Sequence, residues 1–183
     1  MARKEVVTKN DLLRCAFDLA RSEGFEEVTA RKLAAKAGCS TQPIFRVYKN
    51  MDELLQEVMS HAIAFFEQYY TNYPKAEEDL PFVNLGLAYI GFATNEKHLF
   101  QMMFLSSKRG EHSLYELLNG RSGNLLREIT KAKEQGCLDP EGLFMKMWIF
   151  IHGAASMAIT GDYDLSERET EELLKKTYRA FMA

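Results

Sequence analysis

Helical periodicity runs through almost the whole chain, and it restricts the possible folds more than any other feature. Apolar residues recur every three or four positions in segment after segment. No segment sustains the alternation of apolar and polar residues that a half-buried strand requires. With 183 residues, of which 46% are hydrophobic, the chain can bury a real core. We therefore predict an all-α protein of about nine helices.

Capping residues and glycines indicate where the helices begin and end. Thr8 and Asp11 have the spacing of a capping box, and Thr29 is a good N-cap for the second helix. Ser40 is the predicted N-cap of a short third helix, in which Pro43 occupies the first turn, where a missing N–H costs little. The predicted helices cover residues 10–23, 30–38, a short segment after 40, then 52–70, 81–94, 97–106, 111–135, 140–159 and 166–181, with a charged linker over 74–80.

Three details refine the second half of this prediction. The segment "NGRSG", residues 119–123, is a weak point inside its predicted helix because it contains two glycines. Asp139 and Pro140 provide an N-cap and a first-turn proline for a helix that is apolar on most faces and therefore predicted to be buried. Ser166 and Glu169 have the spacing of a second capping box.

Composition excludes several classes of protein. The N-terminal segment is basic and lacks the apolar region of a secretory signal, and the longest apolar run, residues 147–159, is too short to span a membrane. Cys15, Cys39 and Cys137 are odd in number and widely spaced, which favours neither a disulfide framework nor a metal site. We expect a protein of the reducing cytoplasm, without membrane association, metal or cofactor.

Charge is distributed unevenly along the chain. Residues 1–50 hold ten Lys or Arg against six Asp or Glu, a net charge of +4, whereas residues 51–183 carry a net charge of −7. A basic first quarter suits the binding of a polyanion by the N-terminal part of the chain. Ordinary surface charge is the alternative, and charge alone does not decide between the two.

The second and third predicted helices are short and are joined by a tight turn at Gly38. A pair of this kind has the form of a helix-turn-helix, whose second helix enters the major groove of DNA. Ile44 and Val47 then face inward, while Gln42 and Arg46 face outward together with Thr41. Glutamine can pair with adenine, and arginine with guanine or phosphate. A plain helical corner of a bundle would leave the same local pattern.

The segment "DLLRCAFDLARSEGFEEVTARKLAAKAGCSTQPIFRVYKNMDELL", residues 11–55, resembles the DNA-binding domain of the TetR/AcrR family of transcriptional regulators. The resemblance rests on "EGFEEVT", "LAAKAGCS" and "IFRVYKNMDELL" in this order and at this spacing; "WIFIHGAA", farther along, resembles a segment of some members. It implies a helix-turn-helix domain over residues 1–51, with a basic N-terminal arm, and a ligand-binding and dimerisation domain over residues 52–183.

The resemblance also implies which residues contact DNA: Thr29, Arg31, Ser40, Thr41, Gln42, Phe45, Arg46, Tyr48 and Lys49. The chain departs from the family pattern at three positions. Phe45 lacks a tyrosine hydroxyl that typically reaches a phosphate, Val47 replaces a histidine, and Met51 replaces a lysine at the start of the fourth helix. Arg46, Tyr48, Lys49 and the arm residues Arg3 and Lys4 are the residues able to compensate.

A single helix-turn-helix reads few bases, so two copies placed about 34–36 Å apart are needed for specificity. The resemblance implies a homodimer, formed by the last two long helices, that binds a palindromic operator and represses transcription. The last helix offers one apolar side, formed by Leu173, Leu174, Thr177, Tyr178 and Phe181. Packing of this side within the monomer is the alternative.

The middle of the chain is rich in methionine and aromatic residues, which suit a pocket for a small apolar or aromatic effector. We predict that the pocket is lined by Phe65, Tyr69, Tyr89, Phe92, Met103, Trp148 and His152. Plain core packing is the commoner use of such residues, and a hydrogen-bonded core histidine is the commoner role for His152.

Other functions have less support. An enzyme would require a nucleophile with its base, a pair of carboxylates or a metal cluster, and none is visible in the sequence. A helical scaffold or lipid-binding bundle without a DNA role would leave the basic N-terminal quarter and the polar residues after Gly38 unexplained. A thiol sensor at Cys39 is a third alternative, for which core packing of the thiol is the favoured interpretation.

Overall fold

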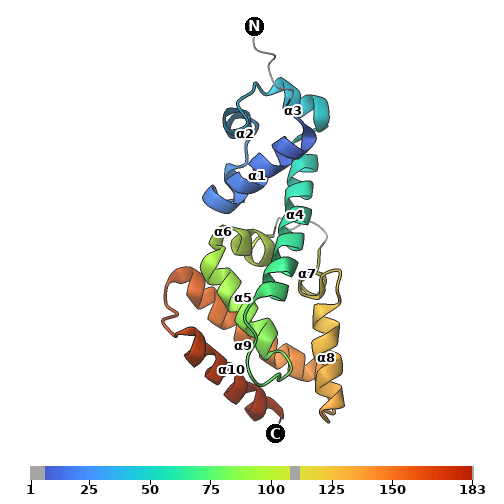
Figure 1. The fold of residues 1–183 in the computed structure, drawn as a ribbon, viewed down its shortest axis with the longest axis vertical. Coiled ribbons are helices and arrows are strands. Elements are labelled where there is room, and N and C mark those ends of the chain that lie inside the picture. Colours follow the sequence, from blue (N-terminus) through green and yellow to red (C-terminus); the bar gives the residue numbers. More distant parts are fainter. Residues whose placement is uncertain (1–6, 108–111, 183) are drawn as a thin grey trace. The chain divides into compact units, whose positions relative to one another are not determined.

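The computed structural model describes residues 7–107 and 112–182, and these residues form helices and connecting loops without strands. The all-α prediction is confirmed. The chain divides into a first unit of residues 1–64 and 98–111 and a second unit of residues 65–97 and 112–183. Each unit is described separately below, and the helices carry the labels of Figure 1.

The first unit begins with α1 (Lys9–Glu23), a short 3-10 turn and α2 (Ala30–Lys36), followed by α3 (Gln42–Val47). The capping box before α1 is confirmed, since Thr8 and Asp11 bond reciprocally. The first part of α4 (Met51–Asn72), the end of α6 (Lys97–Phe100) and a π-helical stretch, Gln101–Leu105, complete this unit. Its core is formed by fully buried apolar side chains of four helices: Leu12, Ala16, Leu33, Ile44, Leu54 and Val58.

The second unit is built around α5 (Val83–Asn95), which is buried on nearly all sides and packs along α9 (Pro140–Thr160) and α10 (Glu167–Met182). Gly86 permits this packing. A Cβ atom there would lie 3.0 Å from side-chain carbons of both Ile151 and Leu174. In addition, α8 (Asn124–Glu134) packs on α9 and on α7 (Leu114–Asn119).

The weak point at residues 119–123 is a complete break between α7 and α8. Gly120 and Gly123 adopt positive φ values of 56° and 67°, which glycine tolerates best. The turn is held by Glu67 of α4, whose carboxylate accepts a hydrogen bond of 2.8 Å from the backbone N–H of Ser122. The hydroxyl of Ser122 donates to the same carboxylate, and these two hydrogen bonds lower the pKa of Glu67. The break raises the number of α-helices in the described residues to ten.

The apolar helix α9 also differs from its prediction. It is 21 residues long and, by length and composition alone, could cross a membrane. Eight of its residues are buried inside the second unit, and the core helix of a folded domain passes the same test. Asp139 caps α9 as predicted, accepting a hydrogen bond of 2.9 Å from the N–H of Gly142.

Candidate nucleic-acid interface and ligand-binding residues

The turn between α2 and α3 is fixed by backbone geometry. Thr29 caps α2 as predicted, with its hydroxyl 3.3 Å from the N–H of Lys32. At the other end of α2, the N–H of Cys39 donates to the carbonyl of Ala34 at 3.0 Å, and Gly38 adopts a φ of 65°. A side chain is disfavoured at such a φ, so Gly38 allows the chain to reverse directly into α3.

The short helix α3 is attached to its unit through one face. Ile44 is fully buried, and Val47 is half-buried. Pro43 lies in the first turn as predicted. The predicted cap is wrong, because Thr41 rather than Ser40 occupies the N-cap position, and its side chain makes no capping hydrogen bond. The hydrogen bond is missing because Thr41 has helical backbone angles, with φ −71° and ψ −18°, whereas a capping residue usually has extended angles.

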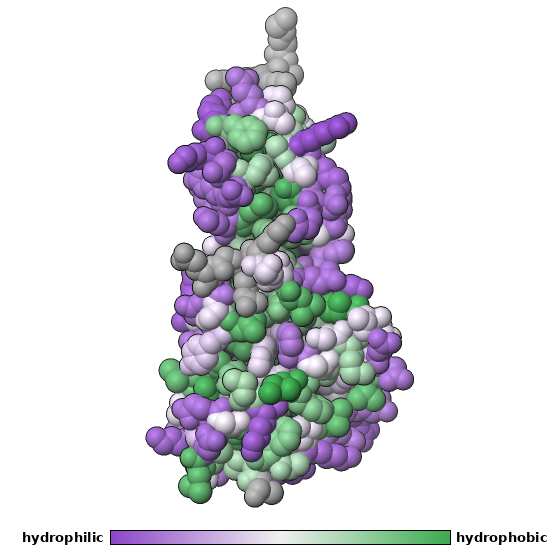
Figure 2. Space-filling model, turned by 180° about the vertical axis from the view of Figure 1, so that it is seen from behind, coloured by the Kyte–Doolittle hydropathy of each residue, from purple (hydrophilic) through white to green (hydrophobic). Residues whose placement is uncertain are grey.

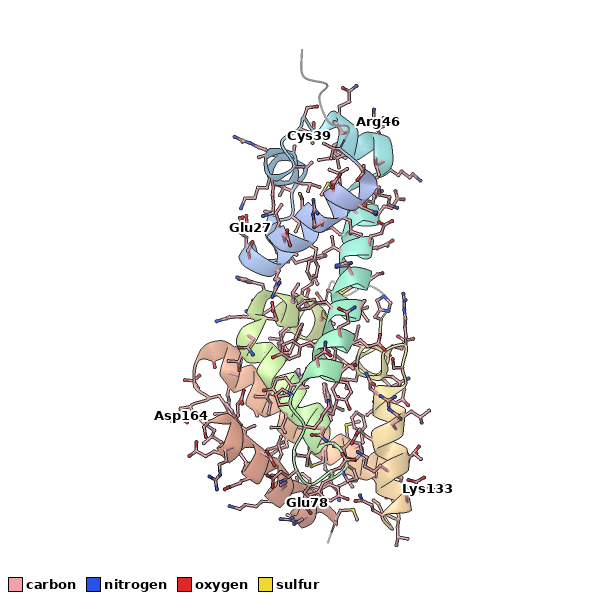
Figure 3. The ribbon with its side chains drawn as sticks, in the orientation of Figure 1. Glu27, Cys39, Arg46, Glu78, Lys133 and Asp164 are labelled. Carbon is pink, nitrogen blue, oxygen red and sulfur yellow. The ribbon has the colours of Figure 1, made fainter. Side chains whose placement is uncertain are left out.

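Eight of the nine residues predicted to contact DNA lie on the surface of the first unit. They come from the start of α2, the turn and α3, and from the residues that follow α3. Phe45 is 51% exposed, a high value for an aromatic side chain. Figure 3 labels Arg46 on α3 and Cys39 in the turn before it. The exposed residues are Thr29, Arg31, Ser40, Thr41, Gln42, Phe45, Arg46 and Lys49.

Tyr48 is the exception, and its position corrects the prediction that it contacts the DNA backbone. Only 1% of Tyr48 is exposed, and its hydroxyl donates a hydrogen bond of 3.0 Å to Glu57 of α4. The ammonium group of Lys9 lies 5.1 Å from the centre of the ring and also pairs with Glu57. Tyr48 therefore connects α1 and α4, through Lys9 over its ring and Glu57 at its hydroxyl.

Met51, another departure from the family pattern, is the first residue of α4 and is half-buried. Asn50 caps this helix by accepting the N–H of Glu53 at 2.9 Å, and Glu53 accepts the N–H of Lys49 at 2.7 Å. The arm residues Arg3 and Lys4 lie outside the described residues.

The predicted ligand-binding residues of the second unit form two neighbouring aromatic groups. In the first, Phe92 contacts Phe65 and Tyr69 at ring-centre distances of 6.3 and 5.2 Å. In the second, the hydroxyl of Tyr89 lies 2.9 Å from Nδ1 of His152, and its ring packs at 4.8 Å on Trp148. Burial lowers the pKa of His152 and raises that of Tyr89.

These residues do not line one pocket. Phe66 connects the two groups, because its ring contacts both Tyr89 and Phe92, but Tyr89 and Phe92 themselves are fully buried. They have the character of core residues, the alternative that the sequence left open. Met103 is fully buried and belongs to the first unit.

Each of the two units has a hollow among its described residues. The hollow of the first unit, about 270 Å³, is lined by the end of α1 with Glu23, the 3-10 turn, His98 of α6 and the π-helical stretch. The hollow of the second unit, about 430 Å³, is an open groove along the last turns of α4. Its lining includes Phe65 and Tyr69 but also Tyr73, which sequence reasoning missed. The recurrence of aromatic residues every four positions, from α4 to the residue directly after it, was the signal for it.

The three cysteines and the possible metal ligands are the remaining candidate functional residues. All three cysteines are free thiols of intermediate exposure, and burial raises the pKa of Cys15. Within the described residues, no group of three or more His, Cys, Asp or Glu residues could hold a metal ion.

Comparison with known proteins agrees with this arrangement. Residues 12–58 match the pattern of "Bacterial regulatory proteins, tetR family", and residues 82–181 match that of "Tetracyclin repressor-like, C-terminal domain". The comparison with curated proteins found no significant match.

Solved structures show the same fold. A putative TetR-family regulator from Vibrio parahaemolyticus is 22% identical with a TM-score of 0.65, and the match covers 94% of this chain and 97% of that one. A putative regulator from Rhodococcus sp. is 14% identical with a TM-score of 0.66 over 95% and 98% of the two chains. A regulator from Marinobacter aquaeolei VT8 is 16% identical with a TM-score of 0.61, covering 93% of each chain.

Proposed function

The chain belongs to the TetR family of transcriptional regulators, and from this premise we propose that it is a homodimeric repressor that binds a palindromic operator and is released by a small-molecule effector. Residues 1–51 form the DNA-binding domain, and residues 52–183 bind the effector and form the dimer. The protein acts in the cytoplasm, as a binding protein rather than an enzyme.

The exposed face of α3 is the observation that carries this proposal. Ile44 holds the helix on its unit, so Gln42, Phe45 and Arg46 are directed away from the core together. Gln42 can pair with adenine, Arg46 with guanine, and the ring of Phe45 can contact a thymine methyl group. A buried anchor with a polar, exposed opposite face is what a helix needs to enter the major groove.

The surrounding exposed residues suit the DNA backbone. Thr29, Arg31, Ser40 and Lys49 lie near the ends of α2 and α3 and carry hydroxyl or cationic groups, which commonly contact phosphate. Tyr48 is left out of the proposed contacts because it is buried. The net charge of +4 in residues 1–50 supports attraction to a polyanion, while the net charge of −7 in the rest of the chain disfavours it there.

The exposed side of α9 supports the dimer. Met145, Ile149 and Met157 recur at multiples of four residues and are 53%, 66% and 48% exposed. Gly153 completes the row, and a Cβ atom there would meet nothing within 4 Å. Figure 2 shows hydrophobic side chains exposed on the second unit, in the lower half of the view. Such a row favours contact with another apolar surface.

The contribution of α10 is smaller than the sequence suggested. Leu174 and Tyr178 are buried inside the second unit, and the Tyr178 hydroxyl donates to Gln135 at 3.0 Å. Packing within the monomer therefore accounts for two of the five residues of the predicted apolar side. Leu173, Thr177 and Phe181 are partly exposed and remain available to a second copy beside the row on α9.

DNA binding is tested with the full-length protein and fluorescently labelled duplexes selected by the protein from a random pool. Fluorescence anisotropy should give an affinity that falls steeply with salt concentration, because phosphate contacts release counterions. Gln42→Ala and Arg46→Ala should each weaken binding to the selected duplex by roughly tenfold or more. Lys133→Ala, which removes one exposed cation from α8, is the matched control and should leave the affinity unchanged.

Binding that is absent, that does not depend on salt, or that Gln42→Ala and Arg46→Ala leave intact would contradict the proposal. Circular dichroism of each variant establishes that the fold is retained.

A further inference from the structure

The groove of the second unit lies along the exposed side of the last turns of α4. Phe65 and Tyr69 stand four residues apart on the same side of α4, and Tyr73, directly after the end of the helix, lines the groove with them. Asn72 and Gln68 add amide groups to the lining. The volume of about 430 Å³ falls within the range of small-molecule sites, roughly 300–1,000 Å³.

The rings in the groove are fixed in position by their neighbours. The centre of the Tyr69 ring lies 5.5 Å from that of Tyr73 and 5.2 Å from that of the buried Phe92. The side-chain amide of Asn95 donates a hydrogen bond of 2.8 Å to the hydroxyl of Tyr69. These contacts hold two tyrosine rings in place beside the groove before any ligand arrives.

Gly91 of α5 explains how Tyr73 reaches this position. A Cβ atom at residue 91 would lie 2.5 Å from the Tyr73 ring, closer than real Cβ atoms approach their neighbours. The absence of a side chain at Gly91 therefore lets the ring of Tyr73 lie against the backbone of α5. The tyrosine hydroxyl then lies 3.5 Å from the carboxylate of Glu167 at the start of α10.

Two carboxylates act on the tyrosine hydroxyls of the groove. The charge of Glu167 acts on both tyrosines, and that of the buried Glu96 acts on Tyr69. Burial and these carboxylates raise the pKa of both hydroxyls, that of Tyr73 to about 12, so both remain neutral at physiological pH. Among the described residues, no lysine or arginine lines the groove.

A cation from the chain directly after α4 already lies over an aromatic ring of that helix. The ammonium group of Lys75 lies 4.2 Å from the centre of the Tyr70 ring and donates to the carbonyl of that residue at 2.7 Å. Lys75 is therefore directed to Tyr70, and the open groove contains the rings of Tyr69 and Tyr73 instead. Aromatic faces attract cations, and nearby carboxylates strengthen the attraction.

We propose that this groove binds an organic cation, such as a quaternary ammonium group with an aromatic or apolar substituent, and that such a cation is the effector of the regulator. The rings of Tyr69, Tyr73 and Phe65 surround the cation, and Glu167 balances its charge. The part of this inference that concerns regulation rests on the proposed function, whereas the binding site does not.

Isothermal titration calorimetry with the full-length, DNA-free protein in phosphate buffer tests the site. The probe is phenyltrimethylammonium, and tert-butylbenzene is its neutral isostere. We expect the cation to bind at least tenfold more tightly than the isostere. Tyr73→Leu, which keeps an apolar side chain, and Glu167→Gln, which removes only the charge, should each weaken cation binding severalfold. Glu172→Gln removes a carboxylate of α10 that pairs with Arg168 and is not among the charges acting on Tyr69 or Tyr73, so it should leave the affinity unchanged.

Equal affinities for the cation and its isostere would overturn the inference. So would cation binding that Tyr73→Leu or Glu167→Gln leaves unchanged in a protein whose circular dichroism is intact.

Repeating the anisotropy assay with and without the cation separates the two proposals. Salt-dependent DNA binding by a protein that fails to bind the cation would overturn the groove as a site while supporting the proposed function. Cation binding with the expected variant pattern, in a protein that binds no DNA, would support the site and contradict the proposed function. DNA binding that the bound cation does not weaken would overturn its role as effector.

Discussion

The helices α3 and α9 both expose apolar side chains, but they are attached to their units in opposite ways. The six residues of α3 are held by the fully buried Ile44, and their exposed side combines Phe45 with polar residues. In contrast, α9 is 21 residues long, has eight buried residues, and exposes a row that is almost entirely apolar. A mixed polar face suits a hydrated polyanion, whereas an apolar row suits a second protein surface.

The two helices also differ in what stabilises them. A helix of six residues is marginal by itself, so α3 exists because its neighbours hold it. A recognition helix of this kind is therefore sensitive to one core substitution, while α9 is supported along its whole length.

The largest expected effect comes from breaking the attachment of α3. Ile44→Ala should lower the free energy of unfolding by about 3 kcal/mol, because it removes a fully buried side chain and leaves a cavity. The adjacent change Phe45→Ala should lower it by less than about 0.5 kcal/mol, since Phe45 is half exposed. Urea denaturation measures both values. Similar costs for the two variants would show that α3 is not held mainly by Ile44.

The second prediction concerns the apolar row of α9. Ile149→Asp places a carboxylate in the proposed contact between copies, where burial of an unpaired charge is costly. The dissociation constant of the dimer should rise at least about 30-fold, roughly 2 kcal/mol. The monomer should keep its fold, because Ile149 is 66% exposed. Sedimentation velocity over a range of concentrations gives the constant.

Phe45→Asp is the control for this experiment, because it introduces the same charge at an exposed apolar residue of α3. It should leave the dimer intact. A dimer that survives Ile149→Asp would remove α9 from the interface, and a dimer that Phe45→Asp dissociates would reverse the roles of the two helices.

These two helices also indicate how much could be read from the sequence. The existence of both was predictable, because apolar spacing, Gly38 and Pro140 are local signals. The burial of Tyr48 was not, since it depends on Glu57, a residue of another helix whose carboxylate accepts the tyrosine hydroxyl. The family pattern suggested a DNA contact, but the hydrogen bond across helices decided the orientation of the ring.

The candidate sites show the same contrast between local sequence signals and contacts between helices. The exposed residues of α3 were predictable, because one buried position on a short helix determines which side faces water. The groove was only partly predictable. Phe65 and Tyr69 were identified, but their separation from Tyr89 and Trp148 depends on how α4, α5 and α9 pack. The missing side chain of Gly91, which admits Tyr73, has an effect only in three dimensions.

The third prediction concerns how His152 of α9 makes the free energy of unfolding depend on pH. Burial lowers the pKa of His152, so the unfolded chain binds a proton more readily than the folded one. The stability that this residue contributes is present above its ordinary pKa of about 6.5 and is lost as pH falls below it. Replacement by Phe should remove this pH-dependent part of the free energy of unfolding, which we expect to be below about 1 kcal/mol because His152 is partly exposed.

Urea denaturation of the wild type and His152→Phe at pH 7.5 and 5.5 isolates the effect, because the contributions of other titrating groups cancel between the two proteins. Near α3, in contrast, burial and Glu57 raise the pKa of Tyr48. The stability that Tyr48 contributes is therefore lost only in alkaline solution, above about pH 10. Parallel pH curves for the wild type and His152→Phe would contradict the prediction for α9.

The smallest expected effect distinguishes the two helices at their first residues. Asp139 caps α9 through a hydrogen bond to the N–H of Gly142, whereas Thr41 and Ser40 provide no such bond for α3. Asp139→Ala should therefore lower the free energy of unfolding by about 1 kcal/mol, and Thr41→Ala and Ser40→Ala by no more than a few tenths. Thermal denaturation of the three variants, monitored by circular dichroism, compares them directly. A loss near 1 kcal/mol for Ser40→Ala would restore Ser40 as the cap of α3, and its side chain would then be fixed by the helix and less available to DNA.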